Sequence, residues 1–433
     1  ASFVDILQQL VEKAIAKQPE KIESILRDIE NLSIDINQFP LGKIAYNIEI
    51  AIAGYQIVLS HQEPGSEKWA KTQNNLANAY YSRIRGEKAE NIESAIASYT
   101  AALKVRTREA FPEQWATTQN NLAIAYSDRI RGERADNIET AIEFYTAALD
   151  VYTPEAFPEQ WAGMQNNLAA AYFDRIREER AKNIETAIEF YTAALNVRTY
   201  EAFPQKWAMT QNNLGEAYRV RIRGERADNI ETAITSYTAA FDVYTREAFP
   251  EDWAMTQNNL AIAYSDRIRG ERADNIETAI EFYTAALDVY TSDAFPEQWA
   301  ATQHNLGEAY RVRIRGKKTQ NIENAIASYT AALEVRTREA FPEDWAGTQN
   351  NLATAYLYRI RGERADNLEN ASASYTAALS VFTREAFPQN HAETSFNLGL
   401  AYREVPNLQL AYDTFSDAIN TVELLRGGIY SGD

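Results

Sequence analysis

Apolar residues recur along the chain in blocks that repeat every 46 residues. The seven tryptophans mark this period, because each lies 46 residues after the one before: Trp69, Trp115, Trp161, Trp207, Trp253, Trp299 and Trp345. In the block that starts at Trp115, the large apolar residues Trp115, Leu122, Tyr126 and Ile130 follow one another at steps of seven, four and four. These steps match the period of an amphipathic α-helix and not that of a β-strand. The pattern therefore predicts a repetitive, all-α protein.

Proline and glycine mark where the helices of one block begin and end. Pro112 suits the first turn of a helix, where its missing N–H costs no hydrogen bond, and Gly132 suits the position just after a helix. We therefore expect a first helix from about Pro112 to Arg131. Asp136, followed three residues later by Glu139, resembles a capping box that opens a second helix. The apolar residues of that second helix recur at steps of three and four: Ile138, Ala141, Ile142, Tyr145, Ala148, Leu149 and Tyr152.

Each block is thus expected to form a pair of antiparallel helices. Neither helix can bury its apolar face alone, so the pairs must stack, each repeat covering the next. We expect capping helices with a degenerate leading repeat over residues 1–68, seven repeats over 69–390, a shorter repeat over 391–426 and a flexible tail over 427–433. The segment Asn47–Tyr55 resembles Asn91–Tyr99 and is expected to be the second helix of the leading repeat.

The shorter repeat carries a family resemblance. Its segment NLGLAYREVPNLQLAYDTFSDAI places Leu398, Gly399, Tyr402, Ala411, Phe415 and Ala418 at the spacing of the tetratricopeptide repeat (TPR). The longer blocks resemble TPRs with six extra residues in the turn between the helices, and the resemblance covers about residues 47–426. It implies a right-handed superhelical solenoid whose first helices line the concave wall.

The sequence pattern of the longer repeats shows a second resemblance. The pattern NNLAxAYxxRIRGERAxN is similar to the TPR arrays of bacterial, especially cyanobacterial, proteins with a CHAT (caspase-like) protease domain. Such arrays also serve as sensors in signal-transduction NTPases, and kinesin light chains hold cargo peptides with related repeats. The resemblance implies a binding scaffold or, alternatively, the sensor array of a larger signalling enzyme. A CHAT protease uses a His/Cys dyad, and this chain has no cysteine, so it is not itself the protease.

A recurring asparagine is the first candidate for binding a partner. It precedes the leucine of every first helix, and on a helical wheel it lies opposite the apolar stripe. It matches the family position whose amide holds the backbone of a bound peptide, and an amide offers both donors and an acceptor. The alternative is that these asparagines bond to the adjacent repeat and lock the stack. They are Asn75, Asn121, Asn167, Asn213, Asn259, Asn305 and Asn351, with Asn397 in the shorter repeat.

Other polar residues are candidates on the same face. Three neighbouring asparagines belong to this group: Asn120, Asn212 and Asn258. Two Glu/Arg pairs stand where other repeats differ, so they could set specificity or form solvated helical pairs: Glu216 with Arg219, and Glu308 with Arg311. A ladder of arginines could clamp carboxylates, but pairing with acidic residues of the same turn, such as Glu133 and Asp136, is the favoured interpretation. The ladder is Arg85, Arg131, Arg177, Arg223, Arg269, Arg315 and Arg361.

Composition and net charge limit the classes of function that we expect. The net charge is −18, which argues against nucleic-acid binding because phosphates require clustered Lys and Arg. No apolar run is long enough to span a membrane, and the N-terminal segment lacks the order of a secretory signal. The absence of cysteine fits the cytoplasm. The three histidines and the dispersed acidic residues form no evident catalytic, metal or cofactor site. We therefore expect a non-catalytic, cytoplasmic scaffold that binds a protein or peptide, and the sequence leaves self-association open.

Overall fold

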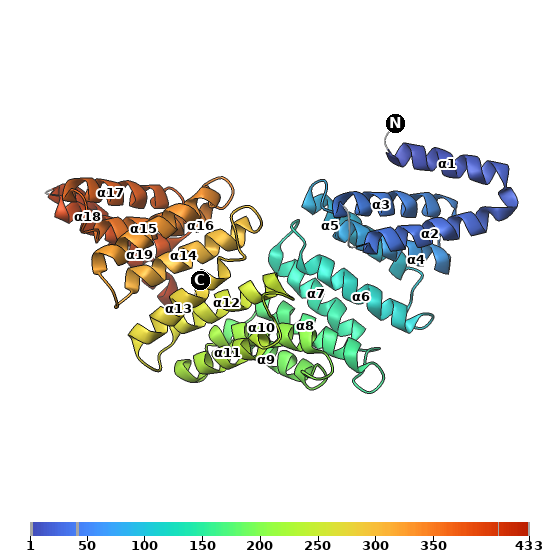
Figure 1. Cartoon of the computed structure of the whole chain (residues 1–433), viewed down its shortest axis with the longest axis horizontal. Helices are drawn as coiled ribbons and strands as arrows, with labels where there is room; N and C mark the ends of the chain where they lie inside the picture. Colours follow the sequence, from blue (N-terminus) through green and yellow to red (C-terminus); the bar gives the residue numbers. More distant parts are fainter. Residues whose placement is uncertain (1–2, 40–42, 406, 432–433) are drawn as a thin grey trace. The chain divides into compact units, whose positions relative to one another are not determined.

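Helices are the only regular elements in the described chain. The computed structural model describes residues 3–39, 43–405 and 407–431, which contain 19 α-helices and one short 3-10 helix, η1 (Pro19–Lys21) (Figure 1). They form two compact units, residues 1–223 and 224–433. The first unit contains α1 (Phe3–Lys17), α2 (Ile22–Gln38), α3 (Ile44–His61), α4 (Glu67–Tyr81), α5 (Lys88–Leu103), α6 (Pro112–Ser127), α7 (Arg134–Ala148), α8 (Pro158–Asp174), α9 (Arg180–Leu195) and α10 (Pro204–Arg219). The second contains α11 (Arg226–Phe241), α12 (Pro250–Asp266), α13 (Arg272–Ala286), α14 (Pro296–Val312), α15 (Lys318–Val335), α16 (Pro342–Leu357), α17 (Arg364–Leu379), α18 (Pro388–Glu404) and α19 (Leu408–Ser431).

Within each unit, the 46-residue blocks fold as pairs of packed helices. In the first unit α4 packs on α5, α6 on α7 and α8 on α9, and in the second α12 packs on α13, α14 on α15 and α16 on α17. The shorter repeat forms the pair α18 and α19. The prediction of an all-α stack of helix pairs is therefore confirmed.

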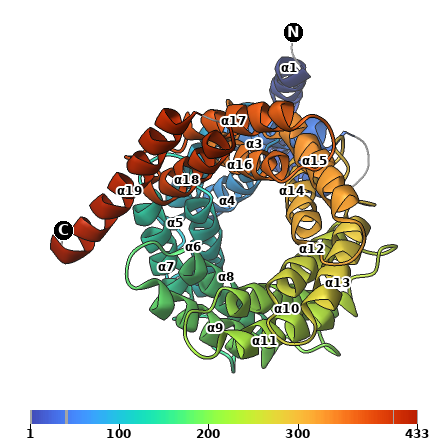
Figure 2. The ribbon, with the colours of Figure 1, turned by 90° about the vertical axis from the view of Figure 1, so that its left-hand side faces the viewer.

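The first helices form the inner side of each unit. α4 contacts α6 and α6 contacts α8, whereas among the described residues of this unit α5 makes no contact with α7. In the second unit α12 contacts α14, and Figure 2 shows α12 and α14 inside α13 and α15. Among the described long repeats, first helices touch across a whole repeat and second helices do not, so each unit curves toward its first helices.

Small residues let the paired helices approach closely. Ala123, Ala141 and Ala148 are fully buried around Tyr145, whose ring is also buried. The predicted apolar positions of the second helix are buried as well, except Leu149, which is half-buried. The same cluster recurs in the other repeats, so the core is a chain of similar small cores.

The first helix is shorter than predicted. α6 ends at Ser127 and not near Arg131, and Ile130 lies in the following turn with 61% of its surface exposed. The cause is the Asn137 side chain, which donates to the backbone carbonyls of Arg129 at 3.3 Å and Arg131 at 2.9 Å. These bonds hold the turn in a non-helical form that Gly132 closes with φ +79°.

The predicted capping box is wrong. α7 begins at Arg134, and no side chain caps its start. Asp136 and Glu139 instead accept hydrogen bonds from Arg177 and Arg175 of the next repeat. The acidic residues at the start of the second helix therefore join repeats and do not cap helices.

The two ends of the chain extend the helical stack. α2 packs on α3, and α3 contains Asn47–Tyr55, the expected second helix of the leading repeat. α19 continues to Ser431, so residues 427–431 of the expected tail are helical, while residues 432–433 lie outside the described residues. Within the described chain, no helix combines the length and apolar character needed to cross a membrane.

Candidate binding face

The predicted asparagine ladder lies half-buried on the first helices, and its members differ in their partners. Asn121 donates to Asn78 of the preceding repeat at 3.3 Å, and Asn167 donates to Asn120 at 3.1 Å. The Nδ2 atom of Asn351 lies 3.4 Å from Nε2 of His304. The other four side chains make no hydrogen bond within the described residues: Asn75, Asn213, Asn259 and Asn305. The ladder thus contains both stacking residues and residues with unused amide groups.

The preceding asparagine serves mainly to join repeats. The Asn258 side chain accepts a hydrogen bond from Thr302 of the next repeat at 3.2 Å. Asn212 is almost completely buried, and Asn120 accepts from Asn167 at 3.1 Å. Asn120 and Asn258 thus bond to the next repeat, as the stacking interpretation proposed for the neighbouring ladder.

The threonine in this interface was not recognised from the sequence. Thr118 donates to Asn74 at 3.1 Å, and Thr210 donates to Asn166 at 3.2 Å. Thr348 lies 2.9 Å from Nδ1 of His304. In the sequence, a threonine recurs three residues after the tryptophan. Its recurrence alone does not distinguish a residue that packs between repeats from one that binds a partner.

The two Glu/Arg pairs are internally neutralised. The Arg219 guanidinium donates to both carboxylate oxygens of Glu216, at 2.8 and 2.6 Å. Arg311 binds Glu308 in the same way, and the Tyr329 hydroxyl also donates to Glu308 at 3.0 Å. The hydrogen bond with Glu308 raises the pKa of Arg311. Each pair is half-buried, so neither is a solvated helical pair.

The arginine ladder pairs with acidic residues, but not with those of the same turn. Arg131 donates to Glu90, and Arg177 donates to Asp136, in each case across the repeat boundary. Arg269 and Arg315 repeat this contact with Asp228 and Asp274. Arg361 donates to Gln320 at 3.3 Å, and Arg85 lies over the Tyr46 ring at 4.0 Å. Acidic partners are thus confirmed for Arg131, Arg177, Arg269 and Arg315. Their expected location within one turn is wrong, because these side chains reach back to the preceding second helix.

A second arginine series, missed by sequence analysis, forms two-bond ion pairs between repeats. Arg129 donates two hydrogen bonds to Glu93 of the preceding repeat, at 2.7 and 3.0 Å. The hydrogen bond from Arg129 lowers the pKa of the Glu93 carboxyl. The sequence does contain a signal for these pairs, because an arginine and a glutamate recur at the two positions in every long repeat. The remaining pairs are Arg83–Glu49, Arg175–Glu139, Arg221–Glu185, Arg267–Glu231, Arg313–Glu277 and Arg359–Glu323.

Cavities open between neighbouring first helices. One of about 530 Å³ lies between α4 and α6, and one of about 550 Å³ lies between α6 and α8. Both include Gln114 and Thr117 in their walls, so they adjoin. The first contains Arg106 and the second Arg198, two buried arginines that sequence analysis did not select. In the sequence, these two residues stand out because the position before the threonine that follows the second helix is Arg here and Tyr or Phe in other repeats.

Two histidines lie among polar side chains. His304 is half-buried between Thr348 and Asn351 of the next repeat. His391 lies 3.1 Å from the Thr421 hydroxyl and 3.2 Å from the Asp417 carboxylate. Across the ranges that the structure describes, no three His, Asp or Glu side chains converge as a metal site would require. The polar groups of the inner face are therefore suited to hydrogen bonding and ion pairing.

Solved structures with a similar fold contain helical repeats. A signal-transduction ATPase with numerous domains and a tetratricopeptide repeat sensor, from Pyrococcus horikoshii, superposes with a TM-score of 0.57 at 12% identity. The match covers 95% of this chain and 66% of that one. The C-terminal part of a TPR repeat-containing protein from Cytophaga hutchinsonii matches with a TM-score of 0.40 at 12% identity, over 72% of this chain and 95% of that one. A Rap protein complexed with competence and sporulation factor matches with a TM-score of 0.42 at 12% identity, over 99% of each chain.

Sequence comparison points to the same family. No curated protein sequence matches the chain significantly. The family model described as tetratricopeptide repeat matches residues 69–109 and 115–154. These residues form the pairs α4–α5 and α6–α7, and the other long repeats have the same sequence pattern and the same helix pair. Residues 69–109 and 115–154 are therefore identified as tetratricopeptide repeats, and the chain shares its helical fold with a protein that contains such repeats.

Proposed function

We propose that this protein is a non-catalytic scaffold that binds a segment of another protein along its first helices. The observation that carries the proposal is the unused amide groups on the first helices: Asn75 and Asn213 in the first unit, and Asn259 and Asn305 in the second. An amide side chain can pair with the backbone of an extended peptide without reading its side chains. Cavities adjoining the same helices offer room for the side chains of the bound segment. The absence of cysteine fits action in the cytoplasm.

Neighbouring asparagines of the second unit allow a test that separates binding from stacking. A random-peptide phage library would be selected on the whole protein, and the selected peptides would be measured against variants. Replacing Asn259 and Asn305 together by alanine is expected to weaken peptide binding at least tenfold with little change in melting temperature. Asn258→Ala removes the acceptor of Thr302 and is expected to lower stability by about 1–2 kcal/mol.

An exposed residue on a second helix provides the negative control. Glu281→Ala on α13 is expected to leave both binding and stability unchanged. Selected peptides that bind the Asn259/Asn305 double variant as tightly as the wild type would refute the role of these amides. Failure to select any peptide would argue against the scaffold function itself.

A second candidate function is the sensor array of a larger signalling enzyme, such as a signal-transduction NTPase or a CHAT protease. It is supported by the fold shared with the Pyrococcus horikoshii ATPase, in which tetratricopeptide repeats form a sensor. Reading the gene in both directions beyond the present sequence would test it. A nucleotide-binding or caspase-like domain in the same frame is the expected result, and stop codons directly on both sides would contradict it.

A further inference from the structure

The position after each second helix carries either arginine or an aromatic residue. The arginines are Arg106, Arg198 and Arg336, and the other long repeats have Tyr152, Tyr244, Tyr290 and Phe382. Arg106 is 8% exposed and Arg198 is 6% exposed. Each arginine donates to the interface threonine of the next first helix; the Arg106 bond to Thr118 and the Arg198 bond to Thr210 are both 3.2 Å long. Three guanidinium groups are thus inserted between repeats.

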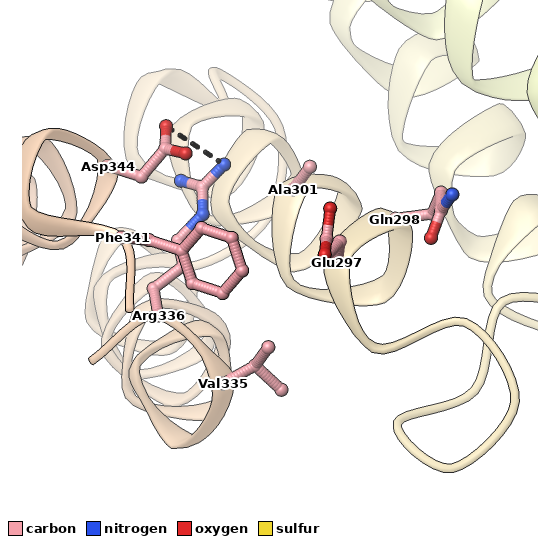
Figure 3. A pocket seen from close by; sticks show the side chains of 7 residues that line it. All are labelled: Glu297, Gln298, Ala301, Val335, Arg336, Phe341 and Asp344. Atoms are coloured by element: carbon pink, nitrogen blue, oxygen red, sulfur yellow. Dashed lines mark ion pairs between the residues drawn. The ribbon is translucent and has the colours of Figure 1, made fainter. Parts of the chain in front are cut away.

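Only Arg336 has a carboxylate partner. Its Nη2 atom lies 3.5 Å from Oδ1 of Asp344, on the wall of a cavity in the second unit (Figure 3). Asp344 lies eight residues after Arg336, and the residue at the same distance from Arg106 is Gln114. The residue at that distance from Arg198 is Lys206. Within the part of the chain that the structure describes, no carboxylate forms an ion pair with Arg106 or Arg198.

These two guanidinium groups have hydrogen-bonding capacity to spare. A guanidinium has five N–H donors, and the Nε atom of Arg198 is buried without a partner. Burial lowers the pKa of Arg106 and of Arg198, because the charged form has lost water. A buried charge without a counter-ion is costly, and a carboxylate that entered the site would offset this cost.

Both guanidinium groups can be reached from the groove on the first helices. Arg106 is part of the wall of the cavity that also holds Lys68, Lys71 and Asn75. Lys68 and Lys71 are paired with Glu23 and Glu30 of α2. Glu67, on the same wall, acts on Arg106 electrostatically but forms no ion pair with it, so Arg106 is the cation of this cavity without a directly bonded carboxylate.

The second guanidinium lies directly behind a glycine. A Cβ atom added at Gly163 would lie 3.4 Å from Nη2 of Arg198, so no side chain at this position covers the charge. The neighbouring Glu159 is paired with Lys206; it acts on Arg198 electrostatically but forms no ion pair with it.

We propose that the groove over α4, α6 and α8 binds an extended, acidic peptide segment, with one carboxylate against Arg106 and another against Arg198. Each carboxylate would take the place that Asp344 occupies beside Arg336. The two arginines lie two repeats apart, or about 20 Å for helices packed 8–10 Å apart. An extended peptide covers this distance with about six residues. The inference rests on the proposed function and assigns the chemistry of the bound segment.

The test uses a fluorescein-labelled octaglutamate peptide and the whole protein. Fluorescence anisotropy at low ionic strength is expected to show binding of octaglutamate and none of octaglutamine. Gln114→Asp supplies Arg106 with an internal carboxylate, so it is expected to weaken octaglutamate binding about tenfold, the equivalent of one ion pair of about 1.4 kcal/mol. The same variant is expected to raise the melting temperature, which separates lost binding from lost folding.

Three further variants complete the test. Arg106→Gln removes one of the two proposed cations and is expected to weaken octaglutamate binding. Arg108→Gln makes the same change in net charge, but Arg108 is half-exposed and pairs with Asp150. Arg108→Gln is therefore expected to change octaglutamate binding less than twofold. Asp344→Gln removes the counter-ion of Arg336 and is expected to increase octaglutamate binding.

Three results would overturn the inference. These are no octaglutamate binding by the wild type, equal losses for Arg106→Gln and Arg108→Gln, and unchanged binding in Gln114→Asp. Phage-selected peptides that still depend on Asn259 and Asn305 would show that the scaffold function stands while the carboxylate sites fail.

Discussion

The pair formed by Arg129 and Glu93 offers a direct test of how the repeats are held together. The two side chains are 28% and 24% exposed, and their hydrogen bonds of 2.7 and 3.0 Å are charge-assisted. Removing one partner leaves the other charged and partly buried. We therefore expect Glu93→Gln and Arg129→Gln each to lower the free energy of unfolding by about 1.5–3 kcal/mol. The double variant is expected to lose less than the sum, with a coupling energy of about 1–2 kcal/mol.

The assay is a double-mutant cycle measured by urea unfolding, with circular dichroism as the probe. Because repeat arrays can unfold in stages, hydrogen exchange of the α5 and α6 amides would localise the loss to this interface. The pair Arg108–Asp150 is the matched control, since it also joins two repeats at 2.7 Å but is 49% and 54% exposed. Its coupling energy is expected to be below about 0.5 kcal/mol. Equal coupling in the two cycles, or strict additivity at Arg129 and Glu93, would refute the reasoning.

The same pair sets a dependence on pH. The folded-state pKa of Glu93 is lowered from its ordinary value of 4.5, chiefly by the hydrogen bond from Arg129. The unfolded chain therefore binds the proton first as the pH falls, and stability is lost between pH 4.5 and the lowered folded value. The coupling energy is expected to be complete at pH 7 and absent once Glu93 is protonated in both states.

Two further predictions concern single repeats. Glu178 has φ +68°, where other repeats have a glycine near +79°. We therefore expect Glu178→Gly to stabilise the first unit by about 0.5 kcal/mol and Gly132→Ala to destabilise it by about 1 kcal/mol. Thermal unfolding checks both, and a lower melting temperature of Glu178→Gly would contradict backbone strain at this position. Burial lowers the pKa of His304 from 6.5 to about 4, so the unfolded state binds the extra proton and stability falls as the pH drops from 6.5 to 4. His304→Asn, the residue of most other repeats, is expected to remove this part of the pH dependence of unfolding, and an unchanged profile would exclude His304 as its source.

The helix pair could be predicted from the sequence because its causes are local. Steps of three and four residues placed Ala141, Tyr145 and Ala148 on one buried face, and proline set the start of α6 correctly. The turn was misjudged, because the spacing of Ile130 continues the helical pattern while the Asn137 side chain ends the helix from six and eight residues away.

The roles of the polar residues could not be predicted, because their partners lie in other repeats. Glu139 bonds to Arg175, 36 residues later, and that distance depends on how the repeats stack. A residue that binds a ligand and one that joins neighbours recur with the same period. Asn258 and Asn259 therefore look alike in sequence, although only Asn258 bonds to the next helix pair. Arg106 was overlooked because its alternation with tyrosine suggested neither role.

The shared 36-residue spacing of the arginine–glutamate pairs between the long repeats bears on how such a chain changes its length during evolution. Arg221 bonds to Glu185, and Glu139 stands one period before Glu185. Deleting residues 161–206 would bring Arg221 to the same 36-residue separation from Glu139. Unequal recombination between gene copies can therefore insert or remove whole repeats, and each new junction still forms an arginine–glutamate ion pair. The number of repeats, and with it the length of the protein, can then change without new contacts between repeats.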